Sequence, residues 1–294
     1  MTLNYNSSSE LRIFLEQEKL GMQKRFGQNF LVNPQARQAL VKALCAQPND
    51  EIWEVGPGLG AMTSLLLEMK YKVKAFEIDL GFIRVLKKMF LQDENFNLVE
   101  GDVMKTWPSH AKEGPAPFLL GNLPYNVAAA LLADFIEKGC VFSRMVVTVQ
   151  KEVAMRMAAP AGHNDYSSFS VLCASVYNVK PFLLIKRESF FPQPNVDSMA
   201  VLLEKKTHSN PAEIPRVFYT LVRSLFASRR KTVKNNLTSF LSSRYGKYQA
   251  QDLCAAVLKE NALNENERAE NLELEAFLSL AKSIDNMRVC KQKC

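Results

Sequence analysis

The sequence predicts an α/β fold in which a largely parallel sheet carries helices on both faces, followed by a small all-α C-terminal domain. Two observations carry this prediction. Between residues 51 and 159, short runs rich in β-branched and aromatic residues alternate with segments whose apolar residues recur at intervals of three and four. From residue 216 onwards, every segment has the helical period. Strands that alternate with helices are typical of a parallel sheet buried on both faces.

The elements can be assigned in chain order. A short helix over residues 8–21 and a second helix that starts at Pro34 precede the alternating part. The expected strands there are EIWEVG (51–56), YKVKAFEID (71–79), FNLVEGD (96–102), PFLLGNLPY (117–125) and SRMVVTVQ (143–150). The expected helices are GAMTSLLLEM (60–69), LGFIRVLKKMF (80–90), NVAAALLADFIEKG (126–139) and KEVAMRMAA (151–159).

The pattern changes after about residue 180. Two strands, PFLLIKRESFF (181–191) and NVDSMAVLLEKK (195–206), follow one another without a helix between them, so we expect an antiparallel pair at one edge of the sheet. A polar linker with two prolines, THSNPAEIP, comes next. We therefore expect a lead-in at residues 1–21, a first domain at 22–207 and a helical domain at 208–294.

Composition indicates an ordinary globular protein, with 47% hydrophobic and 23% charged residues. No apolar run approaches the ~20 residues that span a bilayer, and the polar N-terminus does not resemble a secretory signal. The six cysteines include no C-x-x-C pair, which favours a reducing compartment and no metal site. We expect a cytoplasmic protein without a membrane partner, and nothing in the sequence demands more than a monomer.

Positive charge is concentrated in one stretch. Eight basic and no acidic residues lie between Arg216 and Lys247, within a chain of net charge +7. A run of one sign indicates a polyanionic partner such as a nucleic acid; a merely solvated basic helix pair is the alternative. The candidate RNA contacts in this stretch are Arg223, Arg229, Arg230, Lys231 and Lys234.

Three polar features follow successive strands at one edge of the sheet. In EVGPGLGA, Gly56 and Gly58 allow a tight turn that brings free N–H groups close to a ligand. Glu77 ends the next strand, where a carboxylate can accept hydrogen bonds from both hydroxyls of a ribose. Asp102 follows the third strand and faces the expected position of an adenine amine. Glu77 and Asp102 could instead cap the helices that follow them.

The fourth strand ends in the run Asn122, Leu123, Pro124 and Tyr125. The Asn122 side-chain oxygen and the Leu123 carbonyl could each accept one hydrogen of a nucleobase amine. Pro124 presents no competing N–H, and Tyr125 offers a face on which a flipped base can stack. An ordinary Asn-Pro turn is the alternative.

These pieces fit methyl transfer to the exocyclic amine of adenine. The lone pair of that nitrogen is delocalised into the ring, and two fixed acceptors stabilise the positive charge that grows on it. S-adenosylmethionine supplies a reactive methyl group without a metal or a covalent enzyme intermediate. Alignment of the reacting atoms supplies the rest of the catalysis.

Nine segments resemble those of the bacterial small-subunit ribosomal RNA adenine N6,N6-dimethyltransferases, the kasugamycin-sensitivity methylase family. They occur in the family's order: KRFGQNFL, EVGPGLG, FEID, GD, GNLPYN, YSSFSVL, FFPQPNVDS, LFASRRKTVKNNL and RAENLELEAFLSLA. The resemblance extends from about residue 22 to residue 280 and implies a Rossmann-like class I methyltransferase sheet. The role of the longer lead-in at residues 1–21 is left open.

The resemblance also implies residue roles. Asn29 and Leu31 would close over the cofactor, together with Gly56, Gly58, Glu77, Asp102 and Asn122. Phe190 or Phe191 would lie on the other side of the target base from Tyr125, although both could equally be core aromatics.

The function expected from this reading is transfer of methyl groups from S-adenosylmethionine to two adjacent adenosines. The resemblance places these adenosines in a hairpin near the 3′ end of small-subunit (16S) ribosomal RNA, within an immature small ribosomal subunit. The alternatives are a large-subunit ribosomal RNA adenine dimethyltransferase and a non-catalytic ribosome-assembly factor on the same fold.

Overall fold

The computed structural model describes residues 3–21, 28–113, 116–124, 127–207 and 211–291. The chain divides into two compact units. The first consists of Met1–Ala154 and Asn178–Lys205, and the second of Met155–Tyr177 and Lys206–Cys294. The expected boundary at residue 208 lies close to the observed one after Lys205. In contrast to the expectation, Met155–Tyr177 belongs to the second unit, and the lead-in at residues 1–21 is part of the first.

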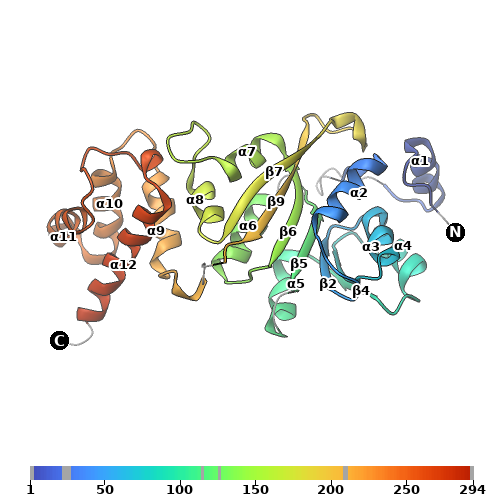
Figure 1. Cartoon of the computed structure of the whole chain (residues 1–294), viewed down its shortest axis with the longest axis horizontal. Helices are drawn as coiled ribbons and strands as arrows, with labels where there is room; N and C mark the ends of the chain where they lie inside the picture. Colours follow the sequence, from blue (N-terminus) through green and yellow to red (C-terminus); the bar gives the residue numbers. More distant parts are fainter. Residues whose placement is uncertain (1–2, 22–27, 114–115, 125–126, 208–210, 292–294) are drawn as a thin grey trace. The chain divides into compact units, whose positions relative to one another are not determined.

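A seven-stranded sheet forms the centre of the first unit, in the order β4-β3-β2-β5-β6-β9-β7 (Figure 1). Its strands are β2 (Glu51–Val55), β3 (Lys72–Glu77), β4 (Phe96–Glu100), β5 (Phe118–Asn122), β6 (Arg144–Gln150), β7 (Tyr177–Ile185) and β9 (Ser198–Lys205). Strands β2 to β6 run parallel to one another, whereas β9 runs antiparallel to β6. The expected parallel sheet is confirmed, and β9 lies between β6 and the edge strand β7.

Helices cover both faces because successive strand residues are apolar on both sides. On β2, Ile52 and Trp53 are both fully buried. Ile52 belongs to the core cluster formed with α2 and α3, whereas the Trp53 ring packs on Phe142, which in turn packs on Phe135 of α6. The helices of this part of the chain are α2 (Pro34–Ala43), α3 (Ala61–Glu68), α4 (Leu80–Phe90), α5 (Val103–His110), α6 (Ala128–Glu137) and α7 (Lys151–Ala158). The sequence did not predict α5, since Pro108 interrupts its pattern.

The lead-in packs against the first unit through a short helix, α1 (Ser8–Gln17), which ends before the expected residue 21. Its buried face, Leu11, Phe14 and Leu15, shares a core cluster with residues of the glycine loop and α4. A separate two-stranded ribbon pairs β1 (Phe30–Leu31) with β8 (Phe190–Phe191) in antiparallel register. The paired residues of this ribbon lie 159 and 161 positions apart in the sequence.

The second unit is all-helical among the residues that the structure describes, apart from its junction with β7. Its main helices are α8 (Ser168–Ala174), α9 (Val217–Phe226), α10 (Val233–Tyr245), α11 (Lys247–Glu260) and α12 (Leu274–Lys291). They enclose a core of their own that includes Phe218, Leu237 and Phe277, all fully buried. Tyr166 and Val171 belong to this core, and Tyr166 Oη donates to Leu272 O at 2.9 Å. These contacts explain why Met155–Tyr177 belongs to the second unit. None of the described helices has the length and apolar character needed to cross a bilayer.

Candidate active site

The glycine loop connects β2 to α3 through a sharp left-handed turn. Gly56, Gly58 and Gly60 have φ values of +70°, +60° and +87°, a region that other residues rarely adopt. A Cβ atom at Gly58 would lie 3.0 Å from the Phe30 ring, and one at Gly60 would lie 2.4 Å from the Phe90 ring. The loop therefore needs glycine for both its backbone angles and its close contacts.

Glu77 connects the glycine loop to the end of β3. Its Oε1 accepts from the Ile78 and Asp79 N–H groups at 2.9 Å, and Oε2 accepts from the Gly58 N–H at 3.1 Å. Burial raises the pKa of Glu77 to about 7, although the three N–H groups act in the opposite direction. Each carboxylate oxygen has about two acceptor sites, so Oε2 retains one for a ligand hydroxyl. This donor and acceptor arrangement fits the ribose of a nucleoside cofactor.

Asp102 lies in the neighbouring loop, next to Glu77. The Gly101 N–H donates to Glu77 O at 2.7 Å, which fixes the start of the loop after β4. Asp102 Oδ1 accepts from the Met104 N–H at 3.0 Å and caps α5. The alternative role as an N-cap is thus what the structure shows, and contact with an adenine amine stays a prediction.

Asn122 ends β5 at the same edge of the sheet. Its Nδ2 donates to Asn29 O at 2.8 Å, which orients the amide and connects β5 to the segment before β1. A Cβ at Gly56 would lie 4.0 Å from Asn122 O. The structure therefore brings together three residues that the sequence assigned to one site, Asn29, Gly56 and Asn122.

The residues after Asn122 form a turn that is partly described. The Leu123 side chain is buried, and its N–H donates to Thr148 O at 3.2 Å. Pro124 O accepts from the Val127 and Ala128 N–H groups, both at 3.1 Å, at the start of α6. Tyr125 lies outside the described residues.

The two candidate base-pocket phenylalanines differ in position. Phe190 is 4% exposed and packs in the core cluster that contains Leu31. Phe191 is half-buried, pairs across the ribbon with Phe30 and lies beneath the Arg12 guanidinium at 5.6 Å. Phe190 is thus a core aromatic, as the alternative allowed, and Phe191 packs against the α1 cluster. Contact of Phe191 with a base stays a prediction.

A second buried carboxylate, Glu54, was not identified from the sequence. Glu54 is 2% exposed on β2 and accepts from Thr63 Oγ1 at 2.7 Å. Burial, with a contribution from the nearby Glu77 charge, raises its pKa to about 7, although the Thr63 hydrogen bond acts in the opposite direction. The signal was present as an acidic residue inside the apolar strand EIWEV, two positions before Gly56.

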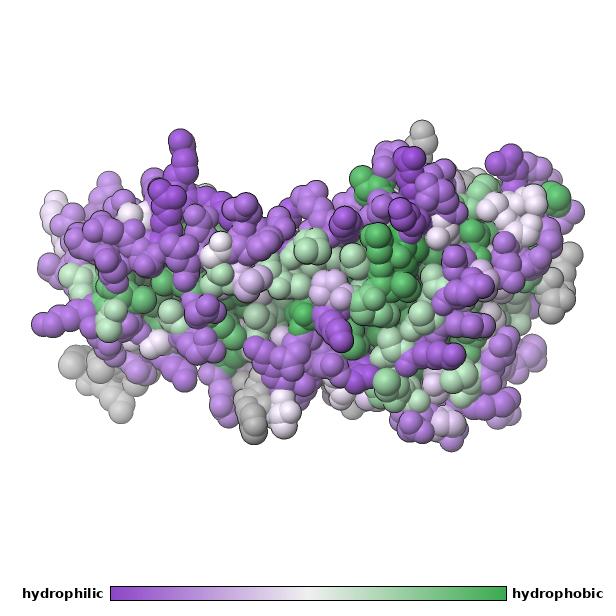
Figure 2. All heavy atoms as spheres, turned by 45° about the horizontal axis from the view of Figure 1, so that its top comes forward, coloured by the Kyte–Doolittle hydropathy of each residue, from purple (hydrophilic) through white to green (hydrophobic). Residues whose placement is uncertain are grey.

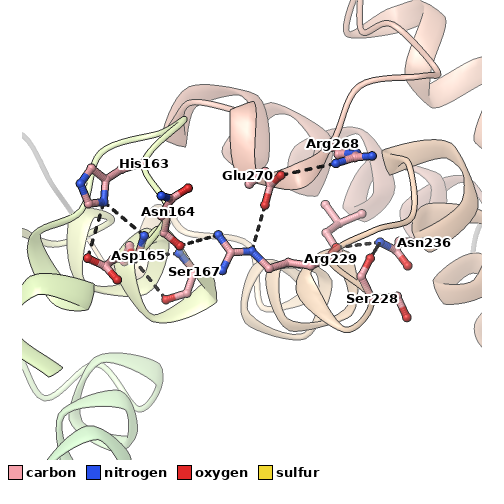
Figure 3. Close-up of polar contacts among 11 residues, drawn as sticks. His163, Asn164, Asp165, Ser167, Ser228, Arg229, Asn236, Arg268 and Glu270 are labelled. Carbon is pink, nitrogen blue, oxygen red and sulfur yellow. Dashed lines mark hydrogen bonds and ion pairs between the residues drawn. The ribbon is translucent and has the colours of Figure 1, made fainter. Parts of the chain in front are cut away.

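The basic residues of the second unit divide into two kinds. Arg229 Nε donates to Glu270 Oε2 at 2.9 Å, and its Nη2 donates to Asn164 O at 2.6 Å (Figure 3). Lys234 forms an ion pair with Glu265 at 2.5 Å. Arg229 therefore joins the α9–α10 turn to two other segments, a structural role that the sequence analysis did not assign to it.

All five candidate RNA contacts are exposed, Arg229 and Lys234 included. Arg223, Arg230 and Lys231 are exposed, and hydrophilic side chains project from the face of the second unit that Figure 2 shows. Arg230 and Lys231 lie directly after Arg229 in the α9–α10 turn. They are the strongest remaining candidates for contact with a polyanion.

Comparison with known proteins identifies relatives over nearly the whole chain. The family model described as ribosomal RNA adenine dimethylase matches residues 20–286. The protein named ribosomal RNA small subunit methyltransferase A of Treponema denticola is 46% identical over 288 residues, which cover 97% of each chain. The protein of the same name from Borreliella afzelii is 36% identical and covers 97% of this chain and 96% of its own.

Solved structures are similar as well. A dimethyladenosine transferase from Plasmodium falciparum aligns with a TM-score of 0.73 and 26% identity, covering 86% of this chain and 96% of its own. The 23S rRNA methyltransferase ErmE aligns with a TM-score of 0.61 and 19% identity, covering 87% of this chain and 99% of its own. At that identity, the second likeness concerns the class I methyltransferase fold alone.

Proposed function

This chain belongs to the family of ribosomal RNA adenine dimethylases, and from that premise we propose that it dimethylates two adjacent adenosines of small-subunit (16S) ribosomal RNA. The adenosines lie in a hairpin near the 3′ end, and the product is N6,N6-dimethyladenosine. The substrate is an immature small subunit, and the enzyme acts in the cytoplasm as a monomer. The names of the relatives, which match over 96% or more of their own length, support this choice of subunit.

The site fits S-adenosylmethionine as the methyl donor. The cofactor supplies an electrophilic methyl group on its sulfonium. Glu77 Oε2 would accept from a ribose hydroxyl, beside the glycine loop whose Gly58 N–H it already binds. Asn29 O, which accepts from the Asn122 amide at 2.8 Å, holds the catalytic amide beside this loop.

Asn122 and Leu123 would act on the target amine. Because Asn122 Nδ2 is already bonded to Asn29 O, its Oδ1 is the atom left to accept an amine hydrogen. The Leu123 carbonyl accepts the other. Both oxygens would stabilise the positive charge that grows on the nitrogen while the methyl carbon leaves the sulfonium sulfur, which becomes a neutral thioether; the nitrogen then loses a proton. The fixed positions of the two residues would lower the entropy cost of alignment.

The single observation that carries this proposal is the convergence of Gly58, Glu77, Asn29 and Asn122 at one edge of the sheet. Its test is methyl transfer from labelled S-adenosylmethionine to small subunits that lack these modifications, with large subunits and naked RNA in parallel. We expect N6,N6-dimethyladenosine in small subunits alone. Label in large subunits would favour the large-subunit enzyme, and tight subunit binding without label would favour an assembly factor.

The exposed pair Arg230 and Lys231 is expected to contact RNA phosphates. Binding weakens as salt rises, so the slope of log K against log salt is negative. Replacing both residues with alanine should make this slope shallower by about 1 to 2, since each lost phosphate contact reduces its magnitude by about 1 or less. The measurement is subunit binding across a range of salt concentrations. Lys259→Ala with Lys282→Ala, which removes two exposed charges from α11 and α12, is the matched control. Equal slopes for both double variants would contradict the assignment.

A further inference from the structure

The lead-in, whose role the sequence left open, contacts the residues around the proposed cofactor site. Leu11, Phe14 and Leu15 of α1 pack in one cluster with Leu59 of the glycine loop and Phe82 of α4. Figure 1 shows α1 near α4 at the N-terminal end of the first unit. The lead-in is thus packed against the loop that would cradle the cofactor.

Arg37 of α2 binds the lead-in to β1. Its side chain is 5% exposed, and its Nη1 donates to Leu31 O at 2.7 Å and to Tyr5 O at 3.1 Å. Its Nη2 donates to the Asn6 side-chain oxygen. One buried guanidinium therefore holds the β1 residue implied in cofactor binding and two residues of the lead-in.

Tyr5 continues this connection to the glycine loop. Its Oη donates to Leu59 O at 2.9 Å. The same peptide group carries the Gly60 N–H, which donates to Pro57 O at 2.9 Å. Because a peptide group is planar, a contact that fixes the Leu59 carbonyl also fixes the direction of that N–H. Glycines restrain the backbone little, so the loop depends on such contacts for its shape.

Beyond the apolar cluster that holds α1, the lead-in is not packed continuously against α3. A cavity of about 660 Å³ lies between the lead-in and helices α3 and α4, and its lining includes Tyr5, Arg37, Ala61 and Ser64. Side chains therefore do not fill the space between Tyr5 and α3. The hydroxyl of Tyr5 is accordingly a discrete point of attachment.

We propose that Tyr5, supported by Arg37, is a positioning residue for S-adenosylmethionine: it fixes the position of the glycine loop relative to β1. This inference rests on the proposed function. In this role, Tyr5 contacts neither the cofactor nor the reacting atoms. It acts through Leu59, and its loss should weaken cofactor binding while the chemical step is preserved.

The test is calorimetric titration of S-adenosylmethionine into the full-length Tyr5→Phe protein. Loss of one neutral hydrogen bond should raise Kd about fivefold. In steady-state assays, KM for the cofactor should rise by a similar factor, with kcat within twofold of wild type. The matched control is Tyr71→Phe, because Tyr71 Oη also donates to one main-chain carbonyl, Ala46 O at 3.2 Å, away from the glycine loop. Its Kd should equal that of wild type.

A double variant distinguishes a shared network from two independent effects. Arg37→Lys should raise Kd. In that variant, the further change Tyr5→Phe should raise Kd by less than the fivefold expected in wild type, because both residues act through the same contacts to the glycine loop. Equal Kd values for wild type and Tyr5→Phe, or an equal rise in Tyr71→Phe, would overturn the inference. A wild-type protein that binds no S-adenosylmethionine would instead overturn the proposed function.

Discussion

Replacing Asn122 by alanine is expected to lower kcat for methyl transfer by a factor of about 100 to 1000, the usual cost of removing one preorganised group that stabilises transition-state charge. The variant loses the Oδ1 acceptor for the target amine. It also loses the Nδ2 bond to Asn29 O, which holds the segment before β1 beside β5. The first loss acts on the chemical step, and the second acts on the shape of the site.

Single-turnover assays on unmodified small subunits with saturating cofactor would measure this effect. The control is Asn33→Ala, which removes an amide of the same size from the N-cap of α2, where it accepts from the Ala36 N–H at 2.9 Å. That change should cost about 1 kcal/mol of stability and leave kcat within twofold of wild type. A kcat for Asn122→Ala within threefold of wild type would contradict the catalytic role.

Much of the first unit could be predicted from the sequence because its elements are locally determined. The period of the apolar residues and the glycine loop placed β2, α3 and β3 close to their observed bounds. Caps also act locally: Asp79 accepts from the Gly81 and Phe82 N–H groups where α4 begins. α5 was missed for a local reason as well, since its proline conflicts with the helical period.

Long-range contacts could not be predicted in this way. The pairing of Phe30 with Phe191 joins residues that lie 161 positions apart and carry no mutual signal. For the same reason, Tyr166 was placed in the wrong domain, because its contact with Leu272 appears only in the folded chain. The ion pair of Arg229 could not be predicted either, because its acidic partner Glu270 follows 41 residues later. Contact of Arg229 with RNA stays a prediction.

The candidate site shows the same division. Candidate residues such as Gly58, Glu77 and Asn122 could be proposed from their residue types and from their positions at or after strand ends. Residues that support them could not, because a tyrosine in a polar lead-in or an arginine within a helix such as α2 has no distinctive pattern. Tyr5 and Arg37 acquire their importance only through the carbonyl groups that they meet in the folded protein.

The raised pKa of Glu77 predicts a second large effect, a dependence of cofactor affinity on pH. Burial raises this pKa from 4.5 to about 7 in the free protein, and the ionised form is the one that accepts from Gly58 and from a ribose hydroxyl. The affinity for S-adenosylmethionine should therefore increase as pH rises from 6 to 8. Well below the pKa, Kd should change by up to tenfold per pH unit, the limit for one linked proton.

The same pKa shift has the opposite effect on the free protein, whose stability should decrease as pH rises. Between pH 4.5 and about 7, the folded state binds a proton at Glu77 that the unfolded state has released. Its contribution to the free energy of unfolding is therefore largest at low pH and is lost as pH rises through about 7. Bound cofactor, which favours the ionised carboxylate, should reduce this loss.

Calorimetric Kd values at pH 6, 7 and 8 test the argument with two variants. In Glu77→Gln the amide cannot accept from all three N–H groups and the ligand. We therefore expect Kd to rise about 100-fold, which corresponds to about 3 kcal/mol for the loss of hydrogen bonds to a charged group. The pH dependence of Kd should disappear. Glu68→Gln, which neutralises an exposed carboxylate of α3, should retain the wild-type Kd at each pH. A pH dependence that persists in Glu77→Gln would assign the titrating group elsewhere, with Glu54, whose pKa is also raised to about 7, as the next residue to replace.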